Sequence, residues 1–497
     1  MKPLLSILSS LLLAMNANDP KSPLNCPAPS SSKTKVVIVG AGFAGLSVAY
    51  HLLQENSHTI EVELLEARDR IGGRVYPYKL LGKMIDLGGQ WVHEASNLNP
   101  IRQFMENNNL TFHENSRYEN RKECKENKIF DSRTGQEISK GITQMASKIL
   151  RKALRDPELQ ATDMTSWRDL IDRQLELQRA SDDRLSKIPP EAFESAMNYM
   201  VHKTECYEGG RMEERSAITD LYQIKGGPDE IPEGSYYSIL QALHGIIQER
   251  GGTFRLGCLV DSIRYESERS NDCTVKITLR DGFEISADYC VCTVPLGVLQ
   301  QRVIRFIPNL KAPKWKAINA MGMGLLDKLV LMFDTCFWPL RFGVTDIDAT
   351  KVQNFYDASS EVGSPCLICF FGGNAARRVE SQLSDDQVIE EVMTNLRLIF
   401  EKGGIVVPNP VAAKVTRWQQ DPLSFGSYSF AKVGCTEETY DVLAAPVGNL
   451  MFAGEHTSKT SQATVHGAWE TGQREANRLF RLISSSRVMG KVNVLSL

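Results

Sequence analysis

The hydrophobic pattern of the chain alternates between strand-like and helix-like periods, which predicts a mixed α/β protein. Residues 36–39 form an uninterrupted apolar run, and apolar residues then recur at helical spacing up to residue 53. A second predicted strand, TIEVELLE at 59–66, follows and ends at Glu66. The stretches 149–160 and 167–185 instead mix apolar positions at helical spacing with many charges, which is typical of amphipathic surface helices. Buried strands that alternate with helices are typical of parallel sheets in α/β folds.

One further predicted strand, GMGLLDKLVLMF at 322–333, carries a charged residue in an apolar setting. Two-residue alternation places Lys328 on one face with apolar neighbours, and apolar residues also fill the opposite face. A strand that is apolar on both faces is usually buried on both faces. A buried ammonium group is unfavourable unless it is paired or loses its proton. Lys328 is therefore either a lysine that reaches water or a carboxylate, or a residue with a chemical role.

The first strand and helix are joined by a glycine pattern that is typical of dinucleotide binding. Gly40, Gly42 and Gly45 form G-x-G-x-x-G directly after the strand, and the second strand ends at Glu66. Gly40 permits a tight turn, Gly42 lets the backbone approach a pyrophosphate, and Gly45 lets helix and strand pack closely. Glu66 would accept hydrogen bonds from ribose hydroxyl groups. This order of elements predicts a Rossmann-like nucleotide-binding domain.

Composition and charge bear on whether the protein binds nucleic acid, metal or membrane. The formal net charge is −3 and no basic stripe occurs, so we predict no nucleic-acid partner. The 8 histidines and 11 cysteines show no metal-ligand spacing, and we predict no metal. No segment is long and apolar enough to predict a membrane span. The leader has a lysine, an apolar core over residues 4–13 and then small residues, which predicts a signal peptide at 1–17 and a secreted protein. A cytoplasmic protein with an irregular apolar leader is the alternative.

Beyond the glycine loop, the sequence resembles the flavoprotein amine oxidase superfamily. Glu66 is followed by ARDRIGGR, which is similar to the Gly-Gly-Arg extension of that family and implies FAD. Four later segments resemble family motifs in the same order: IDLGGQWVHE (85–94), GCLVDSI (257–263), VCTVPLGVL (291–299) and LMFAGEHTSKTSQATVHGAWETGQREANRL (450–479). Beyond the three glycines and Glu66, the resemblance implies these cofactor-binding residues: Ala44, Arg68, Arg74, Gln90, Trp91, Val260, Trp418, Glu455, Thr464 and Val465.

The order of these motifs implies a FAD-binding domain that is assembled from three chain segments, 33–100, 235–300 and 445–485. An interleaved α+β substrate-binding domain would come from 101–234 and 301–444, with a helical insertion at about 140–220.

Residues near the expected flavin resemble those of the polyamine oxidase branch. Amino-acid oxidases place an arginine after the second glycine pair to hold the substrate carboxylate, whereas here Gly88–Gly89 is followed by QWVH. His93 resembles the histidine that lines the polyamine oxidase tunnel. Monoamine oxidases attach flavin through a cysteine before an aromatic residue; here Ser427 precedes Tyr428, so we predict non-covalent FAD. Trp418 and Tyr428 would form an aromatic wall near the amine.

A polycationic substrate should also meet carboxylates away from the flavin. Three glutamates are candidates: Glu94, Glu205 and Glu208. Thr464 occupies a position where some relatives carry a second aromatic residue, and we expect it to contact substrate as well as cofactor. GLLDKLVLMFDTCFW (324–338) resembles the family strand whose lysine faces the flavin through a water molecule. Lys328 and His93 are therefore the predicted catalytic residues, with the pKa of Lys328 lowered by burial.

The resemblance implies FAD-dependent oxidation of spermine, spermidine or an N-acetylated form at a secondary amine. Dioxygen would be the acceptor, and the products would be an aldehyde, a shorter amine and hydrogen peroxide. An L-amino-acid or monoamine oxidase on the same scaffold is the alternative, and a non-catalytic flavin-binding protein is a more remote one. The histone demethylase branch carries a long helical insertion and an extra amino-terminal module, for which we expect no room in this chain. Which polyamine and which carbon are oxidised stays open, as does the oligomeric state.

Overall fold

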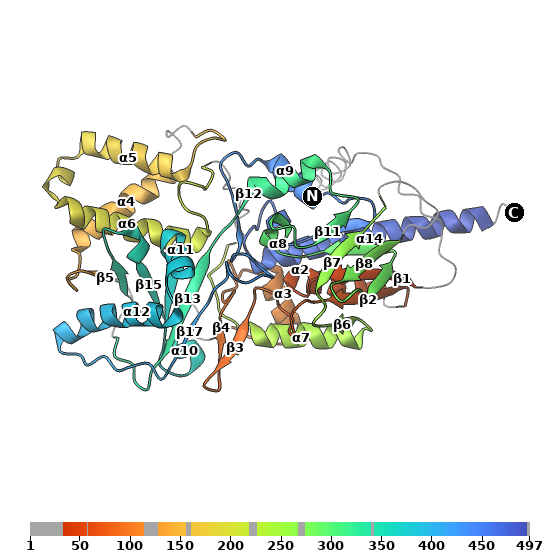
Figure 1. Cartoon of the computed structure of the whole chain (residues 1–497), viewed down its shortest axis with the longest axis horizontal. Coiled ribbons are helices and arrows are strands. Elements are labelled where there is room, and N and C mark those ends of the chain that lie inside the picture. The colour runs from red at the N-terminus through yellow and green to blue at the C-terminus, as the bar shows by residue number, and fades with distance from the viewer. Residues whose placement is uncertain are drawn as a thin grey trace, which may run out of the picture.

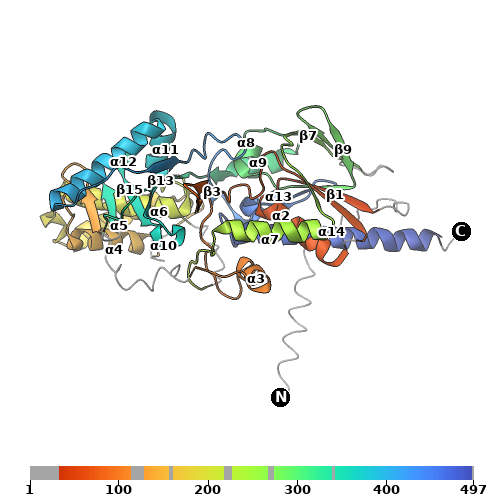
Figure 2. The ribbon, with the colours of Figure 1, turned by 90° about the horizontal axis from the view of Figure 1, so that it is seen from below.

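The computed structural model describes residues 33–56, 58–113, 128–155, 161–217, 226–266, 274–338 and 342–494. It has two parts side by side, and Figures 1 and 2 show the same division from two directions. The predicted signal peptide at 1–17 lies outside the described residues. Among the described residues, no helix has both the length and the apolar character needed to cross a bilayer.

A five-stranded parallel sheet is the centre of the first part (Figure 1). In spatial order its strands are β19 (Leu450–Phe452), β10 (Tyr289–Cys292), β1 (Thr34–Val39), β2 (Ile60–Leu65) and β6 (Thr253–Arg255). One face is covered by α2 (Phe43–Asn56), α7 (Tyr236–Glu249) and α14 (Val465–Val494). Strands from three separated stretches of the chain thus form one sheet, which confirms the predicted α/β fold class.

The other face of this sheet packs on a smaller, four-stranded sheet and on short helices. The sheet has the order β11 (Arg305–Ile307), β7 (Val260–Arg264), β8 (Val275–Leu279) and β9 (Glu284–Ala287). Helices of three segments contribute to this core: α8 (Leu296–Gln300), α9 (Ala312–Ala320) and α13 (Glu437–Ala444). The FAD-binding domain was expected to stop at residue 300 and to resume at residue 445, but the nucleotide-binding core includes segments between these two positions. Apolar residues of β11, α9 and α13 share a buried cluster with β1 and β10, so these segments belong with the nucleotide-binding sheet.

The second part is built on a six-stranded mixed sheet. Its order is β17 (Ala412–Val415), β13 (Leu326–Met332), β16 (Cys366–Gly372), β15 (Gln353–Asp357), β14 (Phe342–Thr345) and β5 (Lys128–Asp131). One face packs on α11 (Gly373–Gln382) and α12 (Asp385–Phe400). The helical insertion comprises α4 (Lys140–Ala153), α5 (Trp167–Ser181) and α6 (Pro190–Glu208), and α6 contacts strands β14 and β16.

Strand β13 is an interior strand whose two faces enter different apolar clusters. Leu329 and Leu331 pack with α11 and α12, whereas Val330 and Met332 pack with the hairpin β3 (Pro77–Leu80)–β4 (Lys83–Asp86). This division is the one that two-residue alternation predicted. The hairpin comes from the amino-terminal segment and reaches from the nucleotide-binding part to this sheet.

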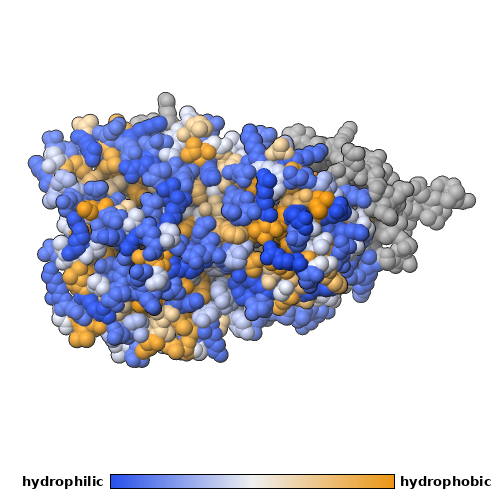
Figure 3. Space-filling view, viewed as in Figure 1, coloured by the Kyte–Doolittle hydropathy of each residue, from blue (hydrophilic) through white to orange (hydrophobic). Residues whose placement is uncertain are grey.

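The outer surface is ordinary for a folded protein. In the view of Figure 3, hydrophilic residues cover most of the described face, and apolar side chains lie in small, scattered groups.

Candidate active site

The loop between β1 and α2 has the close backbone packing expected of a nucleotide-binding turn. Gly40 has φ +105°, a conformation that side chains disfavour. A Cβ atom on Gly45 would lie 2.0 Å from the Gly40 carbonyl oxygen. Ala44, in the first turn of α2, is buried against the core. Glycine is therefore required at Gly40 and Gly45 for the strand to turn directly into the helix.

A second glycine loop packs against the first. Gly42 and Gly72 form a parallel β-bridge, and a Cβ atom on Gly73 would lie 3.3 Å from the Gly42 Cα. The Gly72 N–H donates to the Ala41 carbonyl oxygen (2.8 Å), and the Arg70 guanidinium donates to the Gly73 carbonyl oxygen (2.9 Å). Because the glycines of both loops carry no side chains, a phosphate group could lie close to the backbone at the amino end of α2.

Glu66 lies at the carboxyl end of β2 beside this turn and is buried. Its Oε2 accepts the Ala41 N–H at 2.8 Å and its Oε1 accepts the Arg68 N–H at 2.9 Å. Arg68 pairs with Asp421 at 2.8 Å. Val260 is the first residue of β7. The segment just before it lies beside Glu66, because the Cys258 N–H donates to the Glu66 carbonyl oxygen (2.8 Å). Each carboxylate oxygen of Glu66 retains a lone pair for a hydroxyl group of a nucleotide.

The buried Glu455 forms an ion pair with the half-buried Arg74 at 2.9 Å. Glu455 also accepts from the Ser429 hydroxyl (2.7 Å) and from the Ala463 N–H (2.9 Å). Burial disfavours its charged form, but the nearby Arg74 and these donors outweigh burial and hold the pKa of Glu455 below its usual value. This pair joins the second glycine loop to the segment before α14.

The start of α14 meets the segment 85–94. The Thr464 hydroxyl accepts the Gly467 N–H (2.9 Å) and donates to the Ser461 carbonyl oxygen (2.7 Å), so it caps the helix. A Cβ atom on Gly89 would lie 3.4 Å from the Val465 side chain. The Trp418 ring packs against Gly88, because a Cβ atom added to Gly88 would lie 3.2 Å from Trp418 Cζ2. The structure thus brings three predicted flavin-contact regions together.

Lys328 lies beside this junction and is 3% exposed. Its Nζ donates to the carbonyl oxygens of Asp86 (2.8 Å) and Gly88 (2.8 Å) and to Gln90 Oε1 (3.0 Å). Burial lowers the pKa of Lys328 to about 8, and the Asp86 carboxylate opposes the change. The Lys328 side chain does not reach the protein surface. The direction of its pKa shift agrees with the expectation for a desolvated lysine.

Asp86 is a buried carboxyl group that sequence reasoning did not select. Burial raises its pKa to about 7, although the charge of Lys328 acts in the opposite direction. Its Oδ2 accepts the Tyr236 N–H at 3.3 Å. The available signal was an aspartate at the end of an apolar strand, directly before LGGQW. An ammonium group and a carboxyl group are therefore buried close together.

Aromatic rings surround the Lys328 ammonium group. Its Nζ lies 5.7 Å from the ring centroids of both Trp91 and Phe370. Tyr356 packs edge-on against Trp91 at 5.4 Å between centroids. The Tyr428 hydroxyl donates to the Cys206 carbonyl oxygen on α6 (2.6 Å), which fixes its ring. Phe370 and Tyr356 lie on neighbouring strands of the sheet and were missed because core aromatics look the same in a sequence.

His93 forms a pair with Asp229 that sequence reasoning also missed. His93 Nδ1 lies 3.0 Å from Asp229 Oδ2, and the Glu94 N–H donates to Asp229 Oδ1 (3.1 Å). The His93 ring meets the Tyr207 ring edge-on, with centroids 5.8 Å apart, and the Trp91 ring at 6.4 Å. Burial opposes ionisation of Asp229, but the hydrogen bond to His93 and the His93 charge hold its pKa below the usual value. Asp229 therefore adds an ionised carboxylate beside His93.

The other predicted carboxylates have structural partners. Glu205 is buried, which raises its pKa to about 7, and its Oε1 accepts the Met212 N–H at 3.1 Å. Glu208 pairs with the buried Arg215 at 2.7 Å. These contacts differ from the expectation of glutamates that are free to meet a cation. The segment 205–208 does reach the site, through Tyr207 and through the Cys206 carbonyl.

The family model described as flavin containing amine oxidoreductase matches residues 43–480. The chain belongs to this family. The cofactor is therefore FAD, and the residues that would hold it are the two glycine loops, Glu66 and the Glu455–Arg74 pair.

Two kinds of relative of this flavin amine oxidoreductase occur at similar identity. Polyamine oxidase 4 of Oryza sativa subsp. japonica is 30% identical over 459 residues, which cover 90% of this chain and 88% of that protein. Lysine-specific histone demethylase 1 homolog 2 of Arabidopsis thaliana is 31% identical over 487 residues, 94% of this chain and 61% of that protein. Protein FLOWERING LOCUS D of Arabidopsis thaliana is 32% identical over 475 residues, 90% and 55% respectively. The chain thus spans about half to three fifths of the latter two relatives.

When bound, FAD supplies the two-electron oxidation of an amine in this family. The protein contributes the surroundings of the amine. Trp91, Phe370 and Trp418 provide apolar walls, His93 and Asp229 provide polar groups nearer the surface, and Lys328 provides a buried group that holds or releases a proton.

Proposed function

We propose that this flavin amine oxidoreductase is a polyamine oxidase that acts on a secondary amine of spermine, spermidine or an acetylated form. The observation that carries the proposal is the His93–Asp229 pair beside Trp91, at the position where a carboxylate-binding arginine would serve an amino-acid substrate. A carboxylate whose pKa is lowered stays ionised at neutral pH and attracts a cationic amine. The aromatic walls suit the alkyl spacers between the nitrogen atoms.

Oxidation of a methylated lysine side chain is the second candidate, because several similar proteins are named as histone demethylases. The relatives of both kinds are 30–32% identical to this chain, so the preference for the polyamine reaction rests on the His93–Asp229 pair.

Anaerobic mixing with candidate amines tests the proposal directly. The purified protein is mixed with spermine, N1-acetylspermine, a methylated-lysine histone peptide, leucine or phenylalanine, and the loss of flavin absorbance is followed. We expect a polyamine to bleach the flavin fastest. Faster bleaching by the peptide would select the demethylase reaction, and faster bleaching by leucine would select an amino-acid oxidase. Mass spectrometry of the products would then identify the oxidised carbon.

Asp229→Asn separates recognition from chemistry in the same assay. It keeps the shape of Asp229 but removes the negative charge beside His93. We expect the polyamine concentration for half-maximal bleaching to rise roughly tenfold, with a smaller change in the limiting rate. Asp281→Asn, an exposed aspartate on the turn between β8 and β9, is the matched control.

We further propose that the FAD is held non-covalently and that the protein is secreted. Ser427 precedes Tyr428 where a cysteine would attach the flavin. Acid precipitation should release all yellow colour into the supernatant. The leader pattern at 1–17 supports export. Amino-terminal sequencing of the protein from its own cells should find a mature chain that begins near residue 18, whereas an intact leader in the cytosol would refute export.

A further inference from the structure

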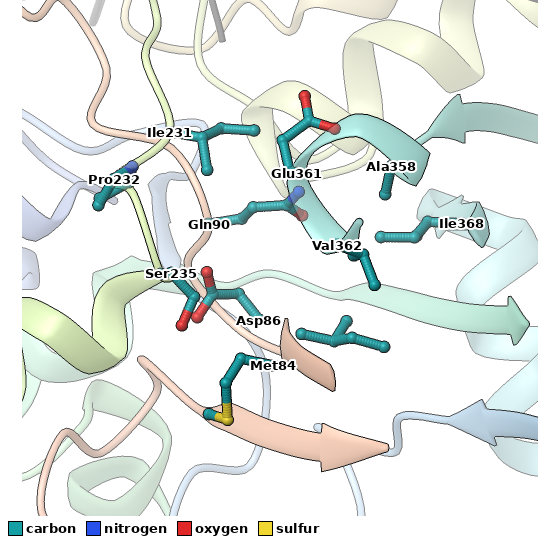
Figure 4. A pocket seen from close by; sticks show the side chains of 12 residues that line it. Met84, Asp86, Gln90, Ile231, Pro232, Ser235, Ala358, Glu361, Val362 and Ile368 are labelled. Atoms are coloured by element: carbon teal, nitrogen blue, oxygen red, sulfur yellow. The ribbon is translucent and has the colours of Figure 1, made fainter. Parts of the chain in front are cut away.

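A cavity of about 200 Å³ lies between the β3–β4 hairpin, the loop before α7 and the short helix α10 (Ser359–Val362) (Figure 4). A water molecule occupies roughly 30 Å³ in the liquid, so the cavity has room for several waters. Its polar lining groups are Asp86, Gln90, Ser235 and Glu361. Apolar side chains such as Met84, Ile231 and Ile368 complete the wall. The assigned parts of the active site do not account for this space.

The Asp86 side chain is directed at this cavity and is incompletely bonded. Its exposed fraction is 4%, and Oδ1 is buried with no hydrogen-bond donor among the described residues. Figure 4 shows its carboxylate turned toward the Ser235 hydroxyl. A buried carboxylate oxygen without a donor is unfavourable, and a water molecule in the adjoining cavity would satisfy it.

Two hydrogen bonds connect the cavity lining to Lys328. The lysine Nζ donates to the backbone oxygen of Asp86 (2.8 Å) and to Gln90 Oε1 (3.0 Å), and both residues line the cavity. The same Nζ lies 5.7 Å from the centre of the Trp91 ring. Lys328 therefore lies between the cavity and the rings of Trp91 and Phe370.

The far side of the cavity approaches solvent. Gly234 is exposed and Glu361 is half-buried, and both line the cavity. The Tyr356 hydroxyl donates to Glu361 Oε1 at 2.8 Å, which holds this carboxylate at the rim. A line of polar groups thus runs from the rim through Asp86 to Lys328.

We propose that this cavity is a water-filled proton path through which Asp86 returns protons to Lys328. Amine oxidation leaves protons to be moved, so the inference rests on the proposed role of Lys328 in that reaction. When Lys328 has given up a proton on the side of the Trp91 and Phe370 rings, the Asp86 carboxylic acid donates its proton to a cavity water, and that water passes a proton to the neutral amine. This leaves a carboxylate and an ammonium ion. The carboxylate then takes a proton from cavity water, and solvent restores that proton. No bond other than O–H and N–H changes, and no electrons move.

The two pKa values support the exchange. Burial brings the carboxyl group up to a pKa of about 7 and the ammonium group down to a pKa of about 8, so proton transfer between them needs little free energy. The groups that act on this pair from the surrounding elements are Ser235 and Tyr236 on the α7 side and Cys366 on β16. The pKa of the Cys366 thiol is raised to about 12, mainly by burial, so it stays protonated.

Flavin absorbance of the resting protein, titrated with pH, reports the charge of Lys328 without turnover. Asp86→Asn is similar in shape to the protonated acid and removes the negative charge. We expect the titration midpoint to fall by about one pH unit, because the loss of a nearby anion favours the neutral amine. An unchanged midpoint would overturn the link between Asp86 and Lys328. Because no substrate is present, this result stands whether or not polyamines are the substrate.

Val362→Phe tests the path itself by filling the cavity without touching either ionisable group. We expect the midpoint to stay in place, turnover to fall by about tenfold, and the solvent deuterium isotope effect on turnover to increase. Val406→Phe, on a valine that is 81% exposed, is the matched control and should change none of these. Wild-type turnover with a filled cavity would exclude it as the path. If polyamines fail to bleach the flavin, turnover is measured with whichever amine does.

Discussion

Lys328→Met is the most direct perturbation of the site. Methionine has nearly the length of lysine but donates no hydrogen bond, so the acceptors at 2.8, 2.8 and 3.0 Å each lose a donor. A buried polar group that is left without its hydrogen-bond partner costs about 1–3 kcal/mol of unfolding free energy. Protonation of Asp86, whose pKa burial has already raised to about 7, offsets part of this loss. We expect a net destabilisation of about 2–4 kcal/mol, with the fold retained.

We expect Lys328→Met to slow turnover as well as to destabilise the protein. A group that holds or releases a proton contributes about 10²–10⁴ in rate, and we expect Lys328→Met to lose tenfold or more. Urea unfolding measures the stability, the flavin-to-protein absorbance ratio measures cofactor retention, and separate anaerobic reduction and oxygen reactions identify the affected half of the cycle. Lys328→Arg is the companion variant, because it keeps a cation but does not release a proton near neutral pH. Wild-type rates in both half-reactions for Lys328→Met, with full flavin content, would refute the catalytic role.

Three further predictions concern the cofactor site and the neighbouring strand position. Gly45→Val should abolish FAD retention in the purified protein, since even a Cβ would lie 2.0 Å from the Gly40 oxygen; a normal flavin-to-protein ratio would contradict this. Glu455→Gln leaves Arg74 without its anion and should weaken FAD binding by roughly tenfold, measured by fluorescence titration of the apoprotein. Asp327 has a pKa that burial raises well above its usual value, so its contribution to stability is present below about pH 4 and is lost as pH rises through the folded-state pKa. Asp327→Asn should flatten this decline by up to about 1.4 kcal/mol per pH unit in urea unfolding, and an unchanged slope would refute it.

Local patterns in the sequence predicted the parts of the fold that depend on local physics. The turn after β1 needs glycine because its backbone has positive φ and tight packing, and that requirement is visible in the spacing of Gly40 and Gly45. The two faces of β13 were predictable because a strand alternates with period two, and each face does enter a different apolar cluster.

The partners of the ionisable groups could not be predicted in this way. Asp229 meets His93 from a loop more than a hundred residues away, and no periodicity connects them. The same reason explains the glutamates of α6. Glu205 and Glu208 were selected for their charge, but the folded chain places the Met212 N–H and the Arg215 guanidinium against them. Long-range pairing of charges depends on tertiary packing, which a single sequence does not display.

The consecutive residues Asp327 and Lys328 show how a strand register organises the site. Because neighbours in a strand point to opposite faces, Lys328 reaches the segment 86–90, whereas Asp327 Oδ1 accepts the Trp418 N–H (3.1 Å) and the Thr416 hydroxyl (2.8 Å). The Lys328 N–H donates in turn to the Thr416 Oγ1 (2.8 Å), so one threonine ties both residues to the strand end that precedes Trp418.

The positions of Lys328 and Trp418 therefore both depend on the register of strand β13. Strand β13 is paired with β16 on one side and β17 on the other, both antiparallel, which resists slippage from either edge. A slip of one residue would exchange the faces of Asp327 and Lys328. It would place a carboxyl group beside the glycine pair and an ammonium group beside Trp418. The register of β13 therefore positions two elements of the site at once, and sheet pairing rather than the local conformation of either side chain keeps them in place.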